Sequence, residues 1–357
     1  MSAEFDGGTV YDSGSVYAAS ETIYAGVDIG GTKTAVVLSS RPPEVLSRVE
    51  FATLPERGPE QAIEKIKAAV GESLQSLGLS RPELRGVGVS CGGPLNRRAG
   101  VIQSPPNLPT WVDVPIKDLL EREFRVPCRV ENDANAGAIA EHRYGAGVGS
   151  SNMVFLTMGT GLGAGIIING RLYYGASDMA GEIGHVRLTR SGPAGYNKVG
   201  SAEGWASGQG MAERAMRVVR AATRRGEPTS LSSRLEKGIL TAKDVGLAAA
   251  EGDAVARRIV EATGRKLGDA LAVLVDVLNP ERIVIGGLAI RLGESLLAPA
   301  REALRREALS ASAEACTVVC ALLGERIGDV AAICVAMSFE TEARSEPAGE
   351  MRHALAG

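Results

Sequence analysis

Two segments of this chain repeat one pattern, in which a short apolar run is followed by glycine and then by a second apolar run. In the first segment Gly30 and Gly31 follow the apolar residues 23–29, and in the second Gly159 follows residues 153–158. Apolar runs of this length that end in glycine are typical of buried strands joined by a tight turn. The repetition indicates an internal duplication, with two lobes that begin alike.

The rest of the chain alternates strands, glycine turns and helices, which predicts an α/β fold with two lobes around a cleft. Helices are expected at 61–77, 132–144, 208–225, 241–250, 254–278, 292–308 and 328–341, and strands also at 34–38, 86–90, 128–131, 164–168, 282–285 and 316–322. The expected parts are a disordered acidic tail (1–22), a small lobe (23–140) completed by the helix 328–341, a large lobe (141–327) and a polar tail (342–357).

Composition excludes several classes of protein. With 39 basic and 42 acidic residues, the net charge of −3 lacks the positive field of a dedicated nucleic-acid binder. The longest apolar stretch, 270–278, is interrupted by Asp276 and is too short to span a bilayer. The five cysteines are scattered and odd in number, and no basic stretch leads an apolar one at the start of the chain. We therefore expect a cytoplasmic protein with small-molecule partners and neither membrane nor nucleic acid among them.

The two glycine turns are candidate phosphate sites. Turn glycines expose backbone N–H groups, Thr32 adds a hydroxyl, and Asp28 could hold a hydrated Mg²⁺. The second turn, 157–163, also offers backbone N–H groups and a hydroxyl but has no acid. It would suit a phosphate-binding turn contributed by the opposite lobe. Neither turn has the spacing of a Walker A loop or of a dinucleotide-binding fingerprint.

Carboxylates and a histidine follow these turns. Asp133 stands where a strand feeds a helix, so it is either a helix cap or a base that accepts the proton of an attacking hydroxyl. Glu182, His185, Glu203 and Asn107 fall in glycine-rich or polar segments and would suit the hydroxyls of a sugar.

Two other patterns are interpreted as structural. The segment 88–92 matches a nucleophile elbow, but the Gly-Gly-Pro sequence that follows cannot begin the helix which an elbow requires. The basic run that starts at Arg214 has no interleaved aromatic residue and is interpreted as a solvated helix face.

In this order, the motifs resemble those of the ROK family of bacterial sugar kinases and sugar-responsive repressors. The resemblance covers about residues 23–339. Its motifs are Asp28-Ile29-Gly30-Gly31-Thr32-Lys33, Pro106-Asn107-Leu108-Pro109 with Trp111, Glu131-Asn132-Asp133-Ala134-Asn135, Thr157-Met158-Gly159-Thr160-Gly161, Ala180-Gly181-Glu182-Ile183-Gly184-His185 and Ile285-Gly286-Gly287.

The resemblance implies the actin-like ATPase fold of hexokinases and a role for each motif. Asp133 would be the general base, and the residues that contact the sugar would be Asn107, Asn132, Glu182, His185 and Glu203. ATP, with Mg²⁺, would be held by Asp28, Gly30, Gly31, Thr32, Lys33, Thr160 and Gly161, with Gly286 and Gly287 beside the adenosine. The family also favours a homodimer.

The chain departs from the family at one place. The family usually has three cysteines between the His and Glu that correspond to His185 and Glu203, and these bind a structural zinc together with the histidine. Here residues 192–203 contain no cysteine. Because three of four ligands are missing, we expect no zinc, and His185 would be oriented by hydrogen bonds alone.

The sequence therefore predicts an ATP-dependent hexose kinase, most closely a glucokinase. The alternatives are a kinase for another hexose or an N-acetylated amino sugar, and a non-catalytic sugar-binding or transcription-regulator member of the family. Only about 24 residues precede the first predicted strand, which is short for the DNA-binding module of the family's repressors.

Overall fold

The structure is a computed structural model that describes residues 22–343, with side chains up to residue 338. The predicted tails, 1–22 and 342–357, lie almost entirely outside the described residues. The described chain divides into two compact units, the first formed by residues 22–132 with 328–343 and the second by residues 133–327. The unit boundary therefore falls at Asn132, eight residues before the expected one at 140, because the whole helix from Asp133 onward packs on the second unit.

The first unit is built on a five-stranded sheet in the order β3-β2-β1-β4-β7. Its strands are β1 (Ile23–Ile29), β2 (Lys33–Ser39), β3 (Ser47–Ala52), β4 (Leu84–Cys91) and β7 (Cys128–Asn132). The strand β2 is antiparallel to both β1 and β3, whereas β4 runs parallel to β1 and β7 runs parallel to β4. A small hairpin of β5 (Leu95–Asn96) and β6 (Val101–Ile102) follows β4.

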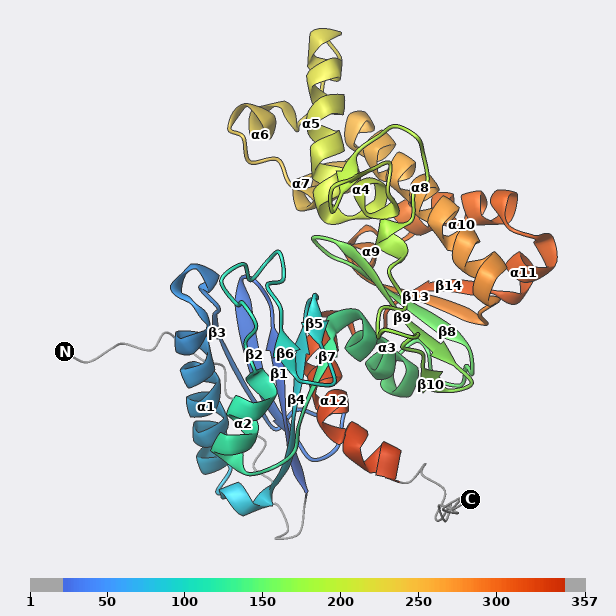
Figure 1. The fold of residues 1–357 in the computed structure, drawn as a ribbon. Coiled ribbons are helices and arrows are strands. Elements are labelled where there is room, and N and C mark those ends of the chain that lie inside the picture. The colour runs from blue at the N-terminus through green and yellow to red at the C-terminus, as the bar shows by residue number, and fades with distance from the viewer. Residues whose placement is uncertain (1–21, 344–357) are drawn as a thin grey trace, which may run out of the picture. The chain divides into compact units, whose positions relative to one another are not determined.

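Helices cover both faces of this sheet (Figure 1). Alternate residues of β1, such as Val27, pack with α1 (Pro59–Ser76) and α2 (Ile116–Phe124) in one core. The opposite face packs against α12 (Ile327–Ala343), where Tyr24 meets Ile333. This alternation is the period-2 pattern of a strand buried on both faces. The predictions missed β3 and α2.

The second unit repeats this plan with the sheet order β10-β9-β8-β13-β14. Its strands are β8 (Met153–Met158), β9 (Leu162–Ile168), β10 (Arg171–Leu172), β13 (Arg282–Gly287) and β14 (Thr317–Cys320). As in the first unit, β8 to β10 are antiparallel, and β13 and β14 run parallel to β8. The matching strand orders support the internal duplication inferred from the glycine turns.

The helices of the second unit also cover both sheet faces. On one face α3 (Asp133–Tyr144) packs against Phe155, and on the other a larger helical layer packs against Leu156. That layer and its connections comprise α4 (Ala202–Ala206), α5 (Gly208–Arg224), α6 (Ser232–Glu236), α7 (Ala242–Ala250), α8 (Ala254–Leu278), α9 (Leu288–Leu292), α10 (Glu294–Glu307) and α11 (Ser310–Ala315).

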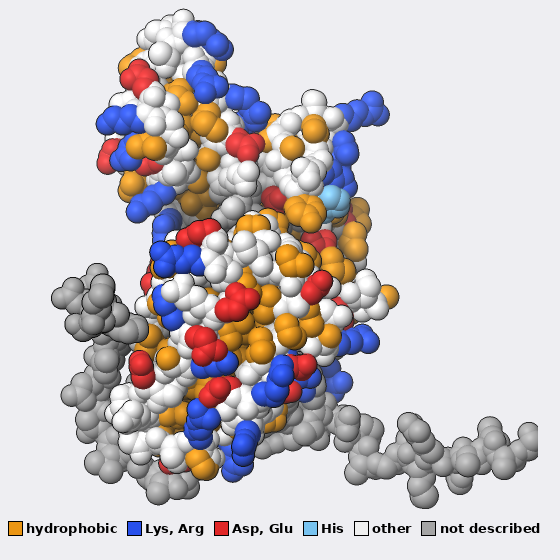
Figure 2. All heavy atoms as spheres, turned by 60° about the vertical axis from the view of Figure 1, so that its left-hand side comes forward, with side chains coloured by type: hydrophobic (Ala, Val, Ile, Leu, Met, Phe, Trp, Pro, Cys, Tyr) orange, Lys and Arg blue, Asp and Glu red, His pale blue; other side chains and the backbone are white. Residues whose placement is uncertain are grey.

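The distribution of charge on the surface agrees with the nearly equal numbers of acidic and basic residues. Acidic and basic side chains are interspersed on the face shown in Figure 2. Within residues 22–343, no helix is long and apolar enough to cross a membrane.

Gly88 in β4 gives a direct test of the packing of α12. A Cβ at Gly88 would lie 2.2 Å from both the Ala332 carbonyl oxygen and the Ala336 nitrogen, so Gly88→Ala must push the helix off the sheet. We expect a loss of about 1–3 kcal/mol in the free energy of unfolding. The matched control is Gly71→Ala in α1, where a Cβ meets no atom within 4 Å and alanine adds helix propensity of up to about 1 kcal/mol. Denaturant unfolding of the two variants measures this, and equal stabilities would contradict the packing.

Candidate active site

The glycine turn of the first unit follows β1 directly. Within it the Gly30 N–H donates to the Lys33 carbonyl (3.0 Å), and the Thr53 hydroxyl donates to the Gly30 carbonyl (2.7 Å). Among the described residues, no hydrogen bond is made by the backbone N–H groups of Gly31 and Thr32. Two accessible amides in a fixed turn are donors of the kind that phosphate oxygens accept.

Asp28 and Lys33 flank this turn in different surroundings. The carboxylate of Asp28 lies against α12, since a Cβ at Gly328 would be 2.2 Å from its Oδ2 atom. Lys33 instead directs its ammonium group to Glu50, with 2.9 Å between Nζ and Oε2. Lys33 is thus held by an acid of the neighbouring strand in this structure.

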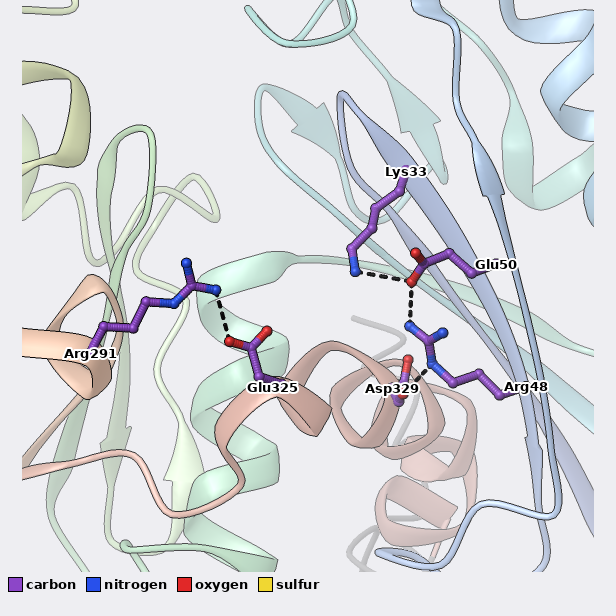
Figure 3. Close-up of polar contacts among 6 residues, drawn as sticks. All are labelled: Lys33, Arg48, Glu50, Arg291, Glu325 and Asp329. Atoms are coloured by element: carbon purple, nitrogen blue, oxygen red, sulfur yellow. Dashed lines mark hydrogen bonds and ion pairs between the residues drawn. The ribbon is translucent and has the colours of Figure 1, made fainter. Parts of the chain in front are cut away.

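The contact of Lys33 belongs to a chain of ion pairs that Figure 3 shows. Arg48 bridges Glu50 (2.6 Å) and Asp329 of α12 (2.8 Å). Arg48, and after it Lys33, lower the pKa of Glu50, whereas burial raises the pKa of Asp329 despite the neighbouring Arg48. The chain therefore ties β2 and β3 to the start of α12. A separate pair in the second unit, Arg291 with Glu325 (2.8 Å), joins α9 to the short helix η4 (Gly324–Arg326).

Two asparagines expected to contact a sugar lie in the first unit near Gly92 and Gly93. A Cβ at Gly31 would lie 2.7 Å from the Asn107 Cβ atom, so Asn107 sits against the glycine turn. A Cβ at Gly93 would lie 3.3 Å from the Asn132 Nδ2 atom. The fold thus gathers these asparagines and the turn at one end of the sheet.

The rejected nucleophile elbow lies in the same region. No helix follows β4 directly, and Ser90 is buried at 1% exposure. A serine nucleophile needs an exposed hydroxyl on a strand-to-helix turn, so the hydrolase alternative has no support here.

The glycine turn of the second unit is braced by α5. The Gly208 N–H donates to the Gly159 carbonyl (2.8 Å), and the Gly159 N–H donates to the Gly161 carbonyl (3.1 Å). The N–H groups of Thr160 and Gly161 make no hydrogen bond within the described part of the chain. This turn therefore also presents two amide donors, as its sequence predicts.

Gly286 and Gly287 lie beside this turn. They end β13 in register with Thr157 and Met158 of the parallel strand β8. Gly287 has a φ of 65°, and a Cβ there would lie 2.4 Å from the Met158 carbonyl oxygen, so only glycine fits. Because parallel strands end at the same edge of a sheet, both glycine segments border one edge of this unit.

Glu203 connects the second turn to the rest of the site. Its Oε2 atom accepts a hydrogen bond from the Leu162 N–H (3.1 Å), and a Cβ at Gly161 would lie 2.6 Å from that same oxygen. Its Cβ atom lies 3.4 Å from the position a Cβ would take at Gly184. Glu203 therefore packs between the glycine turn and the short helix η3 (Ile183–His185).

Asp133 and Glu182 reach the same end of β9 from two sides. The first turn of α3 packs on β9, where a Cβ at Gly163 would be 3.4 Å from the Ala134 Cβ atom. The segment before η3 pairs with β9 through the Ala164 N–H and the Gly181 carbonyl (3.1 Å). The second unit thus brings Asp133, Glu182 and Glu203 together around the start of one strand.

The carboxyls of this cluster have perturbed acidities. Burial raises the pKa of Glu182, the negative charges of Glu203 and Asp133 add to the rise, and His185 opposes it. Desolvation also raises the pKa of Asp133, although the residue is accessible at the surface. The hydrogen bond from the Ala134 N–H (2.8 Å) opposes that rise. Raised carboxyl pKa values in a polar cluster are typical of functional sites.

A hairpin takes the place where the family's cysteines are expected. Its strands are β11 (Ala194–Gly195) and β12 (Lys198–Val199), and its turn residues Tyr196 and Asn197 have positive φ angles of 42° and 62°. The Ser201 hydroxyl accepts hydrogen bonds from the N–H groups of Gly195 (3.0 Å) and Gly204 (3.1 Å). Hydrogen bonds thus hold the segment, and the described residues include no group of three or more metal-ligating side chains.

Tyr196 at the tip of this hairpin contacts His185. The two rings meet edge to face, with 6.5 Å between centroids and an interplanar angle of 74°. His185 therefore has an aromatic neighbour, Tyr196, which is 66% exposed. The sequence did not indicate this contact because Tyr196 belongs to no motif.

Comparison with known proteins gives a consistent result over most of the chain. A model described as the ROK family matches residues 24–338. The glucokinase of Halalkalibacterium halodurans is 36% identical over 312 residues, which cover 87% of this chain and 93% of that protein. The xylose repressor of Caldicellulosiruptor bescii is 29% identical over 80% of this chain and 71% of its own length.

Solved structures agree with the sequence comparison. The crystal structure of a ROK family glucokinase from Streptomyces griseus, in complex with glucose and AMPPNP, has a TM-score of 0.74 and 32% identity to this chain. The match covers 89% of this chain and 99% of that one. The predicted fold class, a two-lobed α/β fold of the actin-like ATPase type, is confirmed.

The electrostatic coupling of Glu203 to Glu182 can be tested by substitution. Glu203→Gln removes a negative charge while keeping an oxygen that can accept the Leu162 N–H. The ionised form of Glu182 then becomes more favourable, so we expect the pKa of Glu182 to fall toward its ordinary value of 4.5. Carboxyl ¹³C NMR titration measures this, with Glu302→Gln on α10 as the matched control. An unchanged Glu182 titration in Glu203→Gln would contradict the clustering.

Proposed function

Because the chain belongs to the ROK family, we propose that it is an ATP-dependent hexose kinase of the glucokinase type. It transfers the γ-phosphoryl group of ATP to a sugar hydroxyl, with Asp133 as general base. The observation that carries this proposal is the cluster of Asp133, Glu182 and Glu203 around the start of β9. It lies next to a glycine turn with two amides that donate to no group of the described residues. The similarity to glucokinases at 32–36% identity supports the same reaction class.

Sugar recognition is assigned to Glu182, His185 and Glu203 of the second unit and to Asn107 and Asn132 of the first. Each carboxylate offers acceptors for sugar hydroxyls, and each asparagine offers both a donor and an acceptor. Glu203 already uses one oxygen for the Leu162 N–H, which fixes its orientation and leaves its other oxygen for a substrate. A hexose is favoured because the similar Streptomyces griseus glucokinase was crystallised in complex with glucose.

The glycine turns fit the phosphates of ATP. Gly31 and Thr32, and likewise Thr160 and Gly161, present amides that no group within residues 22–343 accepts from. Gly30 shapes its turn through the hydrogen bond that its N–H donates to the Lys33 carbonyl. Gly286 and Gly287 would lie beside the adenosine. Asp28 ends β1 next to the first turn and offers the one or two carboxylate contacts with which Mg²⁺ usually accompanies nucleotide phosphates. Bound Mg²⁺ would neutralise charge on the phosphates.

Asp133 is suited to accept the proton of the attacking hydroxyl. Desolvation raises its pKa, which makes its ionised form a stronger base than an ordinary aspartate. Its backbone begins α3, and the Ala134 N–H holds one carboxylate oxygen, so the other oxygen can face the substrate. In phosphoryl transfer the protein mainly positions the nucleophile and stabilises the charge of the transition state. A base that accepts a hydrogen bond from the attacking hydroxyl positions that nucleophile.

The remaining expectations stay predictions of the sequence. They are the absence of zinc, a homodimer, a cytoplasmic location and the lack of nucleic-acid partners.

A substrate survey tests the proposed function. ADP release is followed with glucose, mannose, fructose, allose, their N-acetylated amines and β-glucosides. We expect ATP-dependent turnover with at least one hexose, and highest kcat/KM with glucose. Sugar binding without turnover on any of them would contradict the kinase and favour the sugar-responsive regulator, a class to which the similar xylose repressor belongs by name.

The role of Asp133 is tested with Asp133→Asn. The asparagine keeps an oxygen for the Ala134 N–H, so we expect an unchanged fold and unchanged sugar affinity. Loss of the base should reduce kcat by about 10²–10⁴-fold. The control is Asp118→Asn, an exposed aspartate in α2. Near-normal turnover of Asp133→Asn would reject Asp133 as the base.

Tyr196 is proposed as a positioning residue for His185. In Tyr196→Ala the histidine loses its ring neighbour and can rotate, so we expect the KM for sugar to rise several-fold while kcat changes little. Tyr196→Phe keeps the edge-to-face contact and should retain the normal KM. Steady-state kinetics with varied sugar separates the two parameters. Equal KM values for the two variants would show that the contact does not orient His185.

A further inference from the structure

A cavity of the second unit lies among α4, α5, α8 and α10, and none of the candidate site residues lines it. Its volume is about 380 Å³, which falls in the range of roughly 300–1,000 Å³ typical of small-molecule pockets. Its lining includes five basic residues and one acid. The charged residues that line it are Arg214, Arg258, Arg265, Lys266, Arg306 and Asp269.

Arg214 corrects the interpretation of the basic run as a solvated helix face. Arg217, Arg220, Arg224 and Arg225 are exposed as expected, but Arg214 is only 8% exposed. A guanidinium group costs free energy to bury unless charge or hydrogen bonds compensate. One residue of the run therefore points into the protein, where its charge needs an explanation.

The hydrogen bonds of Arg214 compensate this charge only in part. Its Nη2 atom donates to the Ile259 carbonyl and to the Thr263 hydroxyl (2.5 Å), both neutral acceptors. Its buried Nη1 atom has no hydrogen-bond partner among the described residues. Burial, with smaller effects from Arg217 and Arg265, lowers the pKa of Arg214 to about 10, so it is still a cation at neutral pH.

Trp205 on α4 forms the apolar side of the cavity and is fixed in place. Its indole N–H donates to the Thr189 hydroxyl (2.8 Å), and a Cβ at Gly192 would lie 2.4 Å from its ring. The charged ends of Arg214 and Lys266 lie 5.9 Å and 5.7 Å from this ring. The cavity thus combines a flat aromatic surface with two cations held next to it.

Four of the five cations of the lining have an acidic partner. Asp269 lies 2.7 Å from Lys266 and 3.8 Å from Arg306. Glu307 pairs with Arg306 (2.9 Å), Glu227 with Arg258 and Glu261 with Arg265. Arg214 makes no ion pair with an acid among the described residues. Its charge is therefore the one in the described lining that an anion could still neutralise.

From this geometry we propose that the cavity binds a small organic phosphate, a phosphate monoester with an apolar or ring-shaped body. Arg214 and the cations around it would bind the phosphate oxygens, because guanidinium groups match phosphate geometry. The body of the ligand would pack on Trp205, Val218 and Ala262, which also line the cavity. This apolar wall and the volume favour an organic phosphate over inorganic phosphate. The proposal goes beyond the kinase reaction and does not depend on it.

Binding is tested on the full chain by calorimetry, with fructose 1,6-bisphosphate and glucose 6-phosphate as probes and inorganic phosphate as the comparison. Arg258→Gln, Arg265→Gln and Arg306→Gln are combined in one variant, which leaves the buried Arg214 in place. The matched control combines Arg220→Gln on α5, Arg257→Gln on α8 and Arg305→Gln on α10, which lie outside the lining and remove the same charge. Circular dichroism checks that both variants fold.

We expect the unmodified protein and the control to bind at least one organic phosphate with equal affinity, and the lining variant to bind it at least tenfold more weakly. Inorganic phosphate should bind more weakly than the organic probe. The proposal is overturned if neither organic phosphate binds, if all three proteins bind equally well, or if inorganic phosphate binds as tightly. Because the measurement involves no turnover, its failure leaves the kinase proposal unaffected.

Discussion

The candidate site of the second unit is organised around the hydrogen bond that the Glu203 carboxylate accepts from the Leu162 N–H (3.1 Å). This contact joins α4 to the glycine turn at the start of β9, and the absence of a side chain at Gly161 and Gly184 lets the carboxylate come so close. Asp133 and Glu182 reach the same strand from α3 and from the segment before η3. The Glu203 carboxylate therefore shapes the glycine turn and also belongs to the polar cluster beside it. It connects the turn proposed to bind the phosphates of ATP with the cluster proposed to bind the sugar.

The glycine-rich parts of the fold could be predicted from sequence because their physical constraint is local. An apolar run that ends in glycine allows few structures, and both turns lie where the sequence predicts them, at the ends of β1 and β8. The strand β3 was missed because it is half exposed and contains Arg48 and Glu50, which gave it no apolar pattern. Similarly, the unit boundary depends on which sheet α3 packs against, and that long-range contact has no signal in the local sequence.

Among the polar residues, too, those with a local sequence signal could be predicted and those that depend on tertiary contacts could not. Asp133, Glu182 and Glu203 were selected for their chemistry and their neighbours in sequence, and the fold does bring them to one strand. The contact of Tyr196 with His185 and the burial of Arg214 could not be inferred, because each depends on a neighbour distant in sequence rather than on a motif. Trp205 also shows that α4 has two roles, since Glu203 and Trp205 lie two residues apart on it and face different sites.

A crystal structure of the protein with bound glucose tests the central claim most directly. The account predicts that glucose hydroxyls lie within hydrogen-bond distance of Glu182, His185 and the free oxygen of Glu203. One hydroxyl should also lie within about 3.2 Å of the Asp133 carboxylate, as a general base requires. Glucose bound elsewhere on the chain, or bound with Asp133 directed away from every hydroxyl, would contradict it.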